Sequence, residues 1–209
     1  MIKSIIFFIA SLVIFFAGII FYGMILNLRD VPLAEALAEK HMSYLTNVHL
    51  LVDRRNYRLD LYSDTVLVKS YRAVFGRNNN GARKSLSEKQ VTPAGSYQIC
   101  EIDTASEYRK FLRLNFPNIK DITNAFNSGM ISEREYETLY EELEAGECPK
   151  PSGKKFPSIG IHGTGRLNFI FKNLPFTFNW TKGSIAVSNE NIDEIYSVIK
   201  PGTEVDIKD

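Results

Sequence analysis

The chain has 209 residues, and its 25 basic and 24 acidic side chains leave a formal net charge of +1. Without Lys3 in the N-terminal segment, the remaining basic residues equal the acidic ones in number. This balance argues against nucleic acid as a partner, because binding phosphates needs an excess of basic residues on the surface. The length suits one globular domain with an appendage.

The appendage is the N-terminal segment, where residues 5–28 are almost entirely apolar and carry no charge. As a helix rising ~1.5 Å per residue it would be about 36 Å long, enough to cross a hydrocarbon core of ~30 Å with some tilt. A cleaved signal peptide is the alternative, with Lys3 as its basic start, but its apolar region would have only ~7–15 residues and precede a small-residue cleavage site. We therefore predict an uncleaved transmembrane anchor over residues 1–28, with its N-terminus in the cytoplasm by the positive-inside rule.

A juxtamembrane stalk is predicted over residues 29–46, because apolar residues within 31–45 have the spacing of a short amphipathic helix. From Asn47 the apolar period changes to two, which predicts strands separated by polar turns. The three successive strands, 49–53, 57–62 and 66–71, would form an antiparallel meander. His41 and His49 have no catalytic context and are interpreted as structural residues.

The middle of the chain combines a loop, a strand and a helical insertion. A polar run from Gly76 to Gly81 predicts a long surface loop, and residues 96–102 resume the sheet. The insertion is expected at about 104–151, with helices over 108–114, over 119–126 and from Ser132, which has the spacing of a capping box with Glu135. Its aromatic side chains are expected to pack on the sheet rather than to bind a ligand.

Cys100 and Cys148 are the two cysteines of the chain. In an oxidising compartment they can form one disulfide, and in a reducing one they would more often stay buried thiols. The sequence does not determine their separation, so both states remain open. Cys148 is not expected to be a nucleophile, because nothing in the surrounding residues 146–149 would lower the pKa of its thiol.

Two residues near the C-terminal end are candidate catalytic groups. His162 follows the apolar run 159–161, and Ser184 lies 22 positions later, between Gly183 and a second β-branched run. A strand-end side chain beside a glycine can point into a cleft while the backbone leaves room for substrate. Nucleophiles and their bases are presented in this way. A helix beginning at Ser188 or Asn189 and a strand over 203–207 are predicted to close the domain.

With this layout, residues 47–207 resemble the L,D-transpeptidases, bacterial enzymes that cross-link peptidoglycan. The resemblance rests on the meander and on three motifs in the family's order and spacing, Val91-Thr92-Pro93-Ala94-Gly95-Ser96-Tyr97, His162-Gly163-Thr164 and Gly183-Ser184-Ile185. The chain is most similar to a periplasmic subgroup whose nucleophile turn has the pattern Trp-Thr-x-Gly-Cys-Ile-Ala. This resemblance implies a mainly β fold with α insertions, a β-sandwich-like catalytic domain over 47–209, preceded here by one transmembrane helix.

The resemblance also implies roles for individual residues. His162 would be the base that takes the proton of the nucleophile, and Gly163 would orient it through its backbone carbonyl. Amides around Gly183 and Ser184 would form the oxyanion hole. Members of the family attack the carbonyl of a peptidoglycan peptide stem and transfer the acyl group to an amine, without metal or cofactor. The chain would then be a single-pass protein of the bacterial inner membrane, with its catalytic domain on the periplasmic side.

The sequence departs from the wider family at three positions. Lys182 replaces a second histidine and Ala186 replaces an arginine, as they do in the close subgroup. Ser184 stands where a cysteine is expected, and a hydroxyl, unlike a thiol of pKa ~8.5, is not ionised near neutrality. Ser184 is then a working nucleophile or a substitution of the catalytic cysteine. The alternatives are a catalytically inactive relative that binds peptidoglycan or a partner, and a serine-dependent hydrolase of stem peptides.

Overall fold

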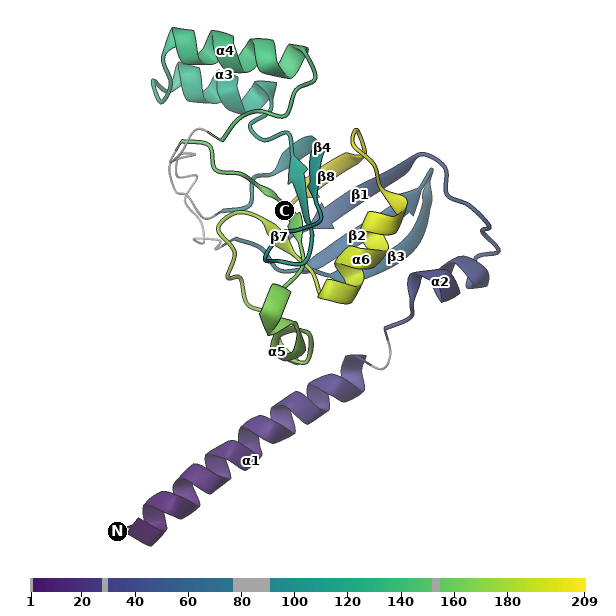
Figure 1. Ribbon diagram of the computed structural model, residues 1–209, viewed down its shortest axis with the longest axis vertical. Helices are drawn as coiled ribbons and strands as arrows, with labels where there is room; N and C mark the ends of the chain where they lie inside the picture. The colour runs from purple at the N-terminus through teal and green to yellow at the C-terminus, as the bar shows by residue number, and fades with distance from the viewer. Residues whose placement is uncertain (1, 28–29, 77–90, 152–154) are drawn as a thin grey trace.

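The computed structural model describes residues 2–27, 30–76, 91–151 and 155–209 (Figure 1). Strands within these residues form one mixed sheet of eight strands in the order β3-β2-β1-β8-β4-β5-β6-β7. Their bounds are β1 Val48–Asp53, β2 Arg58–Ser63, β3 Val66–Arg72, β4 Gly95–Asp103, β5 Phe111–Leu114, β6 Gly160–His162, β7 Ile185–Ala186 and β8 Glu204–Lys208. The loop predicted from Gly76 to Gly81 lies, after Gly76, outside the described residues.

The two ends of the sheet meet and curl it upon itself. Val74, just after β3, bridges to Ala186 in β7, and Gly76 bridges to Thr181. Neighbouring strands are antiparallel except for β1 with β8 and β6 with β7, which are parallel. The predicted mainly β fold with helices is thereby confirmed.

The meander forms as predicted because its apolar residues alternate. Leu50 and Val52 of β1 and Leu59 and Leu61 of β2 are fully buried, and each such side chain contributes ~1.5–3 kcal/mol through burial. The turn between these strands is closed by Asp53, whose carboxylate accepts a hydrogen bond from the Asn56 backbone N–H at 3.0 Å.

The helix predicted over 108–114 is wrong, because this segment contains strand β5. Leu112 and Leu114 are buried while Phe111 and Arg113 are half-buried, an alternation that belongs to a strand. The strand pairs with β4 on one side and with β6 on the other, so its backbone is hydrogen-bonded along both edges. The insertion at 104–151 is therefore helical only from residue 119 onward.

The helix predicted within 31–45 is present but shorter, as α2 Leu33–Glu39. Pro32 precedes its first residue, and His41 beyond its end has a left-handed φ of 54°. Leu33 and Ala36 are buried, and α2 contacts β3. The segment therefore packs on the sheet. His49 stacks on Tyr62, in keeping with a structural role.

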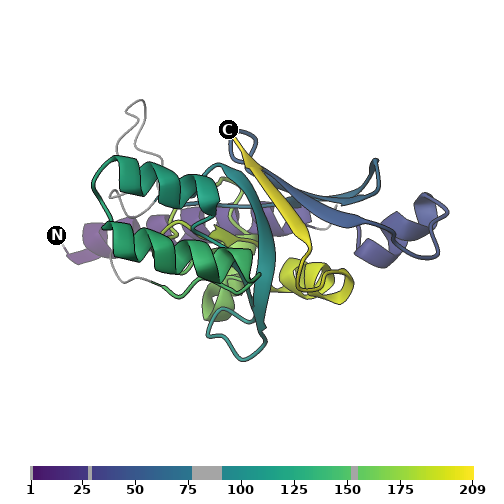
Figure 2. The same ribbon diagram turned by 90° about the horizontal axis from the view of Figure 1, so that it is seen from above.

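Helices α3 Ile119–Asn127 and α4 Glu133–Glu144 form a hairpin outside the sheet, and they lie side by side in Figures 1 and 2. Each begins with a capping box, made by Asn118 and Asp121 in α3 and by Ser132 and Glu135 in α4. A disulfide joins Cys100 in β4 to Cys148 beyond α4, which settles the state of the two cysteines.

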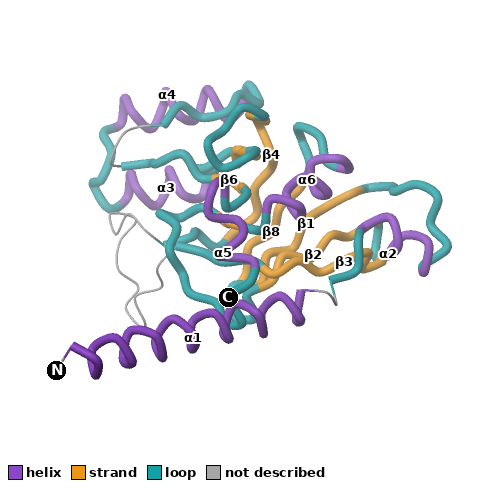
Figure 3. Tube along the Cα trace, turned by 60° about the horizontal axis from the view of Figure 1, so that its bottom comes forward, coloured by secondary structure: helices purple, strands orange, loops and turns teal. Residues whose placement is uncertain are grey.

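The remaining helices are α6 Asn189–Val198, capped by Ser188 as predicted, the single turn η1 Gly165–Leu167, α5 Asn168–Lys172 and α1 Ile2–Asn27. α1 is long and apolar enough to be a candidate membrane span, and most of its residues are exposed. Its C-terminal half lies beside α5 in Figures 1 and 3. Gly23 is its buried residue.

Candidate active site

His162 and Ser184 lie on neighbouring parallel strands. His162 is the last residue of β6 and pairs with Ala186 of β7, while Ser184 directly precedes β7. Both are buried, with 4% and 8% of their surface exposed. The sheet thus brings together two residues that are distant in sequence.

The Ser184 hydroxyl is held by the backbone of β6. Its Oγ accepts a hydrogen bond from the Gly160 N–H at 3.3 Å. A Cβ at Gly160 would lie only 2.5 Å from the Leu112 carbonyl oxygen, so the close approach of β5 requires a glycine there. Within the described residues, no hydrogen bond joins Ser184 Oγ to the imidazole of His162.

The turn before Ser184 is anchored by two threonines. Thr181 Oγ1 donates to the Ser184 carbonyl oxygen at 2.5 Å, and Thr92 Oγ1 approaches the same oxygen at 3.4 Å. Thr92 also accepts a hydrogen bond from the Gly76 N–H at 2.9 Å and is fully buried. Gly183 has a φ of +108°, a conformation that L side chains rarely adopt. The Thr-Pro motif therefore braces the turn that carries Ser184.

The orientation of His162 is set by a backbone carbonyl. Its Nδ1 lies 2.6 Å from the Gly163 oxygen, and because a carbonyl can only accept, Nδ1 must carry the hydrogen. Nε2 is then the basic nitrogen of the neutral ring. Burial lowers the pKa of His162 below its ordinary value of 6.5, while the bond to Gly163 acts in the opposite direction.

Aromatic rings enclose the imidazole. The ring centroid of Tyr108 lies 4.6 Å from that of His162, and those of Phe111 and Trp180 both lie at 5.9 Å. Phe171 of α5 in turn stacks on Trp180 at 5.1 Å. These apolar faces remove water from the ring and are the physical cause of its lowered pKa.

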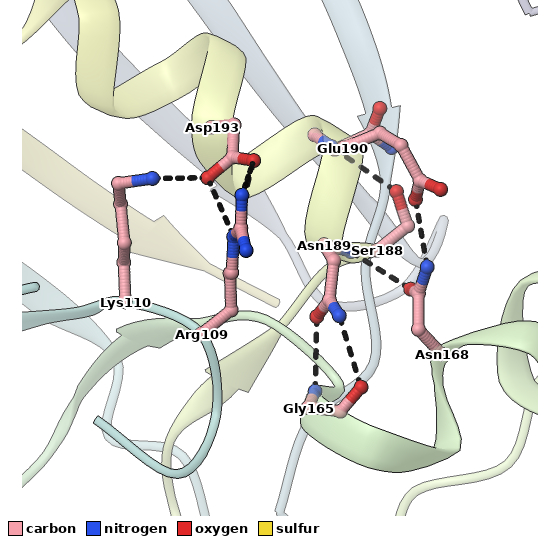
Figure 4. A network of polar contacts seen from close by, with 9 residues as sticks. Arg109, Lys110, Gly165, Asn168, Ser188, Asn189, Glu190 and Asp193 are labelled. Atoms are coloured by element: carbon pink, nitrogen blue, oxygen red, sulfur yellow. Dashed lines mark hydrogen bonds and ion pairs between the residues drawn. The ribbon is translucent and has the colours of Figure 1, made fainter. Parts of the chain in front are cut away.

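A polar network fixes the turn that follows His162 (Figure 4). The Asn189 side chain accepts from the Gly165 N–H and donates to the Gly165 carbonyl, both at 2.9 Å. Asn168 Oδ1 accepts from the Asn189 N–H at 2.8 Å, and its amide donates to Glu190. A Cβ at Gly163 would lie 2.6 Å from Asn189 Oδ1. The start of α6 therefore clamps the backbone that orients the histidine.

A cavity of about 280 Å³ lies next to this site. Trp180, Thr164 and Ala186 line it on the side of the site, and Lys69 and Glu194, joined by an ion pair of 2.7 Å, line another part. Neither His162 nor Ser184 is among its lining residues. Trp180 therefore lines the cavity on one side and contacts His162 on the other.

The structure places the two predicted residues, His162 and Ser184, on neighbouring strands, whereas the residues that support them have no clear signal in the sequence. Thr92 stands out in the sequence only as part of a motif, and the helix predicted over 108–114 does not indicate the contact of Tyr108 with His162. For Asn189 the sequence predicts only a helix-capping role. Its neighbour Ser188 makes the capping contact, with Oγ accepting from the Asn191 N–H at 3.1 Å. No local pattern signals that Asn189 instead bonds to Gly165.

The comparison with protein families is decisive here, since the model of the YkuD family, the L,D-transpeptidase catalytic domain, matches residues 47–207. The chain belongs to this family. No curated protein matches the chain.

Solved structures resemble this L,D-transpeptidase domain at low sequence identity. Bdellovibrio bacteriovorus Bd1075 is 16% identical with a TM-score of 0.46, over 79% of this chain and 48% of that one. L,D-transpeptidase 1 from Mycobacterium tuberculosis is 8% identical with a TM-score of 0.41, over 78% and 62%. L,D-transpeptidase 3 from the same organism, in complex with a faropenem-derived adduct, is 12% identical with a TM-score of 0.45, over 78% and 60%. The match thus spans about half to three fifths of these longer chains.

Proposed function

We propose that this protein is a membrane-anchored acyltransferase of L,D-transpeptidase type, with His162 as base and Ser184 as nucleophile. The observation that carries the proposal is the placement of both residues on the neighbouring strands β6 and β7, with the imidazole buried and its Nδ1 bound to Gly163. The substrate is a peptide stem of peptidoglycan, and the acyl acceptor is an amine.

The reaction begins with the attack of Ser184 Oγ on a stem carbonyl carbon, as the hydroxyl proton passes to His162 Nε2. The C–N bond to the leaving amine then breaks, the histidine returns the proton to that amine, and an ester remains on Ser184. The acceptor amine attacks the ester carbon, its N–C bond forms and the ester C–Oγ bond breaks, and the proton lost from the nitrogen passes through His162 to the released Ser184 Oγ. This cycle consumes no oxidant, metal or other co-reactant.

Two features of the backbone favour this chemistry. The Gly160 N–H donates to Ser184 Oγ, and a donor to this oxygen stabilises the alkoxide character that develops during attack. The Gly183 conformation, with φ of +108°, leaves the amides of Gly183 and Ser184 as candidates for the oxyanion hole, where each donor is worth a few kcal/mol.

The location of the domain outside the cytoplasm is supported by the disulfide between Cys100 and Cys148. Disulfides persist in oxidising compartments such as the periplasm and are rare in the cytosol. Together with the apolar helix α1, it supports a single-pass protein of the inner membrane with a periplasmic domain.

One observation favours a second function. Ser184 Oγ is bonded to Gly160 rather than to His162, and no buried carboxylate supports the histidine among its described hydrogen bonds. A histidine without such support is a weak activator of serine. A catalytically inactive relative that binds peptide stems in the same site is therefore the competing proposal.

The test compares the full chain with Ser184→Cys and His162→Ala on tetrapeptide-stem muropeptides, following acyl-enzyme mass and released product. We expect acylation and amine transfer by the unmodified chain, faster acylation by Ser184→Cys, and a loss of ~10²–10⁴-fold in His162→Ala because the general base is gone.

Each other outcome selects a different function. Reaction of Ser184→Cys alone would overturn the role of Ser184 as nucleophile and keep the site. Stem binding without any acylation, in either form, would establish the binding protein. Hydrolysed stems in place of cross-linked ones would establish a hydrolase.

A further inference from the structure

Large apolar side chains are exposed at the end of η1, on α5 and in the segment that follows α5. They are Leu167, Phe169, Ile170, Phe176 and Phe178, each between 41% and 59% exposed. We call these five residues the apolar face. Contiguous exposed apolar patches mark contacts with a protein or a membrane, and the proposed acyl transfer uses none of these side chains.

The apolar face lies directly beside the end of α1. The Asn27 amide donates to the Lys172 carbonyl and, at 2.9 Å, to Asn173 Oδ1. One turn earlier, Gly23 packs so closely on the Asn173 backbone that any Cβ there would overlap its carbonyl. The end of the candidate membrane span and the segment bearing the apolar face are therefore in direct contact.

This contact sets the depth of the domain relative to a bilayer. Gly23 lies within the apolar part of α1, and Asn27 comes four positions later, a rise of about 6 Å along the helix. If the apolar residues of α1 span the membrane, the Asn173 backbone lies at the level of the headgroups. The neighbouring Phe169 and Ile170, 59% and 48% exposed, then face the same layer.

Basic side chains accompany the apolar face. Residues 165–178 contain Arg166 and Lys172 and no acidic residue, and Lys172 forms an ion pair of 2.5 Å with Glu190 of α6. Basic side chains beside apolar ones are typical of segments that lie in the membrane interface, because they are attracted to anionic headgroups.

We propose that the apolar face is seated in the surface of the phospholipid bilayer next to α1. This inference rests on the proposed anchoring of α1 and goes beyond it, since a single helix alone would leave the domain free to tilt. The helix α1 and the apolar face are then two points of contact with the bilayer, and together they hold the domain in one orientation relative to it. Phe171 of α5 stacks on Trp180 at 5.1 Å, and Trp180 meets His162 edge to face at 5.9 Å. These rings connect the membrane surface to His162, so the site works on peptidoglycan close to the membrane.

The test measures lipid contact in the full chain by tryptophan fluorescence. Phe169→Trp, Phe126→Trp and Phe16→Trp are each reconstituted in vesicles of phosphatidylethanolamine and phosphatidylglycerol with or without brominated acyl chains. Phe126 on α3 is the matched control, because it is an exposed phenylalanine, 39% accessible, on a helix remote from α1 in Figure 1. Phe16 reports on α1, and the unmodified chain, with Trp180 as its one tryptophan, is the background.

We expect bromine to quench the added tryptophan in Phe169→Trp and Phe16→Trp and to leave Phe126→Trp at the level of the unmodified chain. Quenching in Phe16→Trp without quenching in Phe169→Trp would overturn the seated face while the anchor stands. No quenching in Phe16→Trp would overturn both. A blue-shifted but unquenched Phe169→Trp that cross-links as a dimer would show that a second copy covers the face.

Discussion

At the scale of single residues, the site differs from a serine triad in what stands behind the histidine. The Gly163 carbonyl occupies the position of the usual carboxylate on Nδ1. A carbonyl dipole fixes the tautomer but stabilises an imidazolium less than a full negative charge does. In the proposed mechanism, His162 is therefore a well-oriented base whose protonated form is disfavoured.

The first prediction concerns the pH dependence of acylation. Burial lowers the pKa of His162 below 6.5, and only the neutral ring can accept the proton of Ser184. We expect kcat/KM for acylation to rise with pH, with an apparent pKa below 6.5, and to be level at neutral pH. The measurement is the initial rate of acyl-enzyme formation between pH 4.5 and 8. A rise centred above 6.5 would contradict the role of a buried His162 as base.

At the scale of secondary structure, the site depends on contacts between elements far apart in sequence. Strands β6 and β7 are short, with three and two residues. Strand β5 and the bridge from Val74 to Ala186 hold them in place. Around them, α6 and the turn 163–168 are linked through Asn189, and Asp193 of α6 binds Arg109 and Lys110 just before β5 (Figure 4).

The second prediction is that Asn189 positions the histidine. Asn189→Ala removes two hydrogen bonds to Gly165, each worth ~0.5–1.5 kcal/mol, and loosens the turn that holds Gly163. We expect a lower midpoint in urea unfolding and a reduced kcat with little change in stem affinity. Asn124→Ala, at an exposed position of α3, is the control and should change neither. A fall in stability with kcat intact would indicate a structural role alone.

The third prediction concerns the disulfide between β4 and the end of the α3–α4 hairpin. It closes a loop of 48 residues, and cross-links of this kind typically stabilise a folded domain by ~2–4 kcal/mol. We expect the double variant Cys100→Ser/Cys148→Ser to lose stability of this size in urea unfolding. The variant should retain some acylation, because β4, which carries Cys100, is separated by β5 and β6 from β7, which follows Ser184. Complete loss of acylation in a folded variant would contradict this.

At the scale of the whole molecule, the protein consists of the curled sheet with its helices and of the N-terminal helix α1. Curling joins β7 to the end of β3, so the strand that presents Ser184 is not a free edge. The helix α2 packs on β3 and the end of α1 on α5. The end of α1 and the helix α2 are thus both held against the domain.

The fourth prediction separates an uncleaved anchor from a signal peptide. Residues 5–28 lack the short apolar region and cleavage site of a secretory signal. We expect protein made in a bacterial host to keep residues 2–27 by mass spectrometry and to stay with the membrane fraction after carbonate extraction. A shortened, extractable protein would show that the segment is a signal peptide.

Sequence alone determined the strands of the meander and the helices α3, α4 and α6, and it predicts His162 and Ser184 as the central residues of the site. Each depends on local signals: alternation of apolar residues, capping residues such as Ser132 and Ser188, and glycines beside His162 and Ser184. The error over 108–114 has the same origin. Four residues of strand β5 are too few for an alternation to stand out, and pairing with both β4 and β6 decides their conformation.

Only the tertiary structure decided how the site is supported and where it faces. The residues that support His162 and Ser184 are Thr92, Asn189 and Tyr108, which are far from them in sequence or bond to the turns beside them. Such contacts produce no periodic pattern in the sequence. The Cys100–Cys148 bond and the position of the apolar face beside α1 are of the same kind. Local propensity and hydrophobic pattern specify elements, whereas the sites between elements exist only after packing has brought distant side chains together.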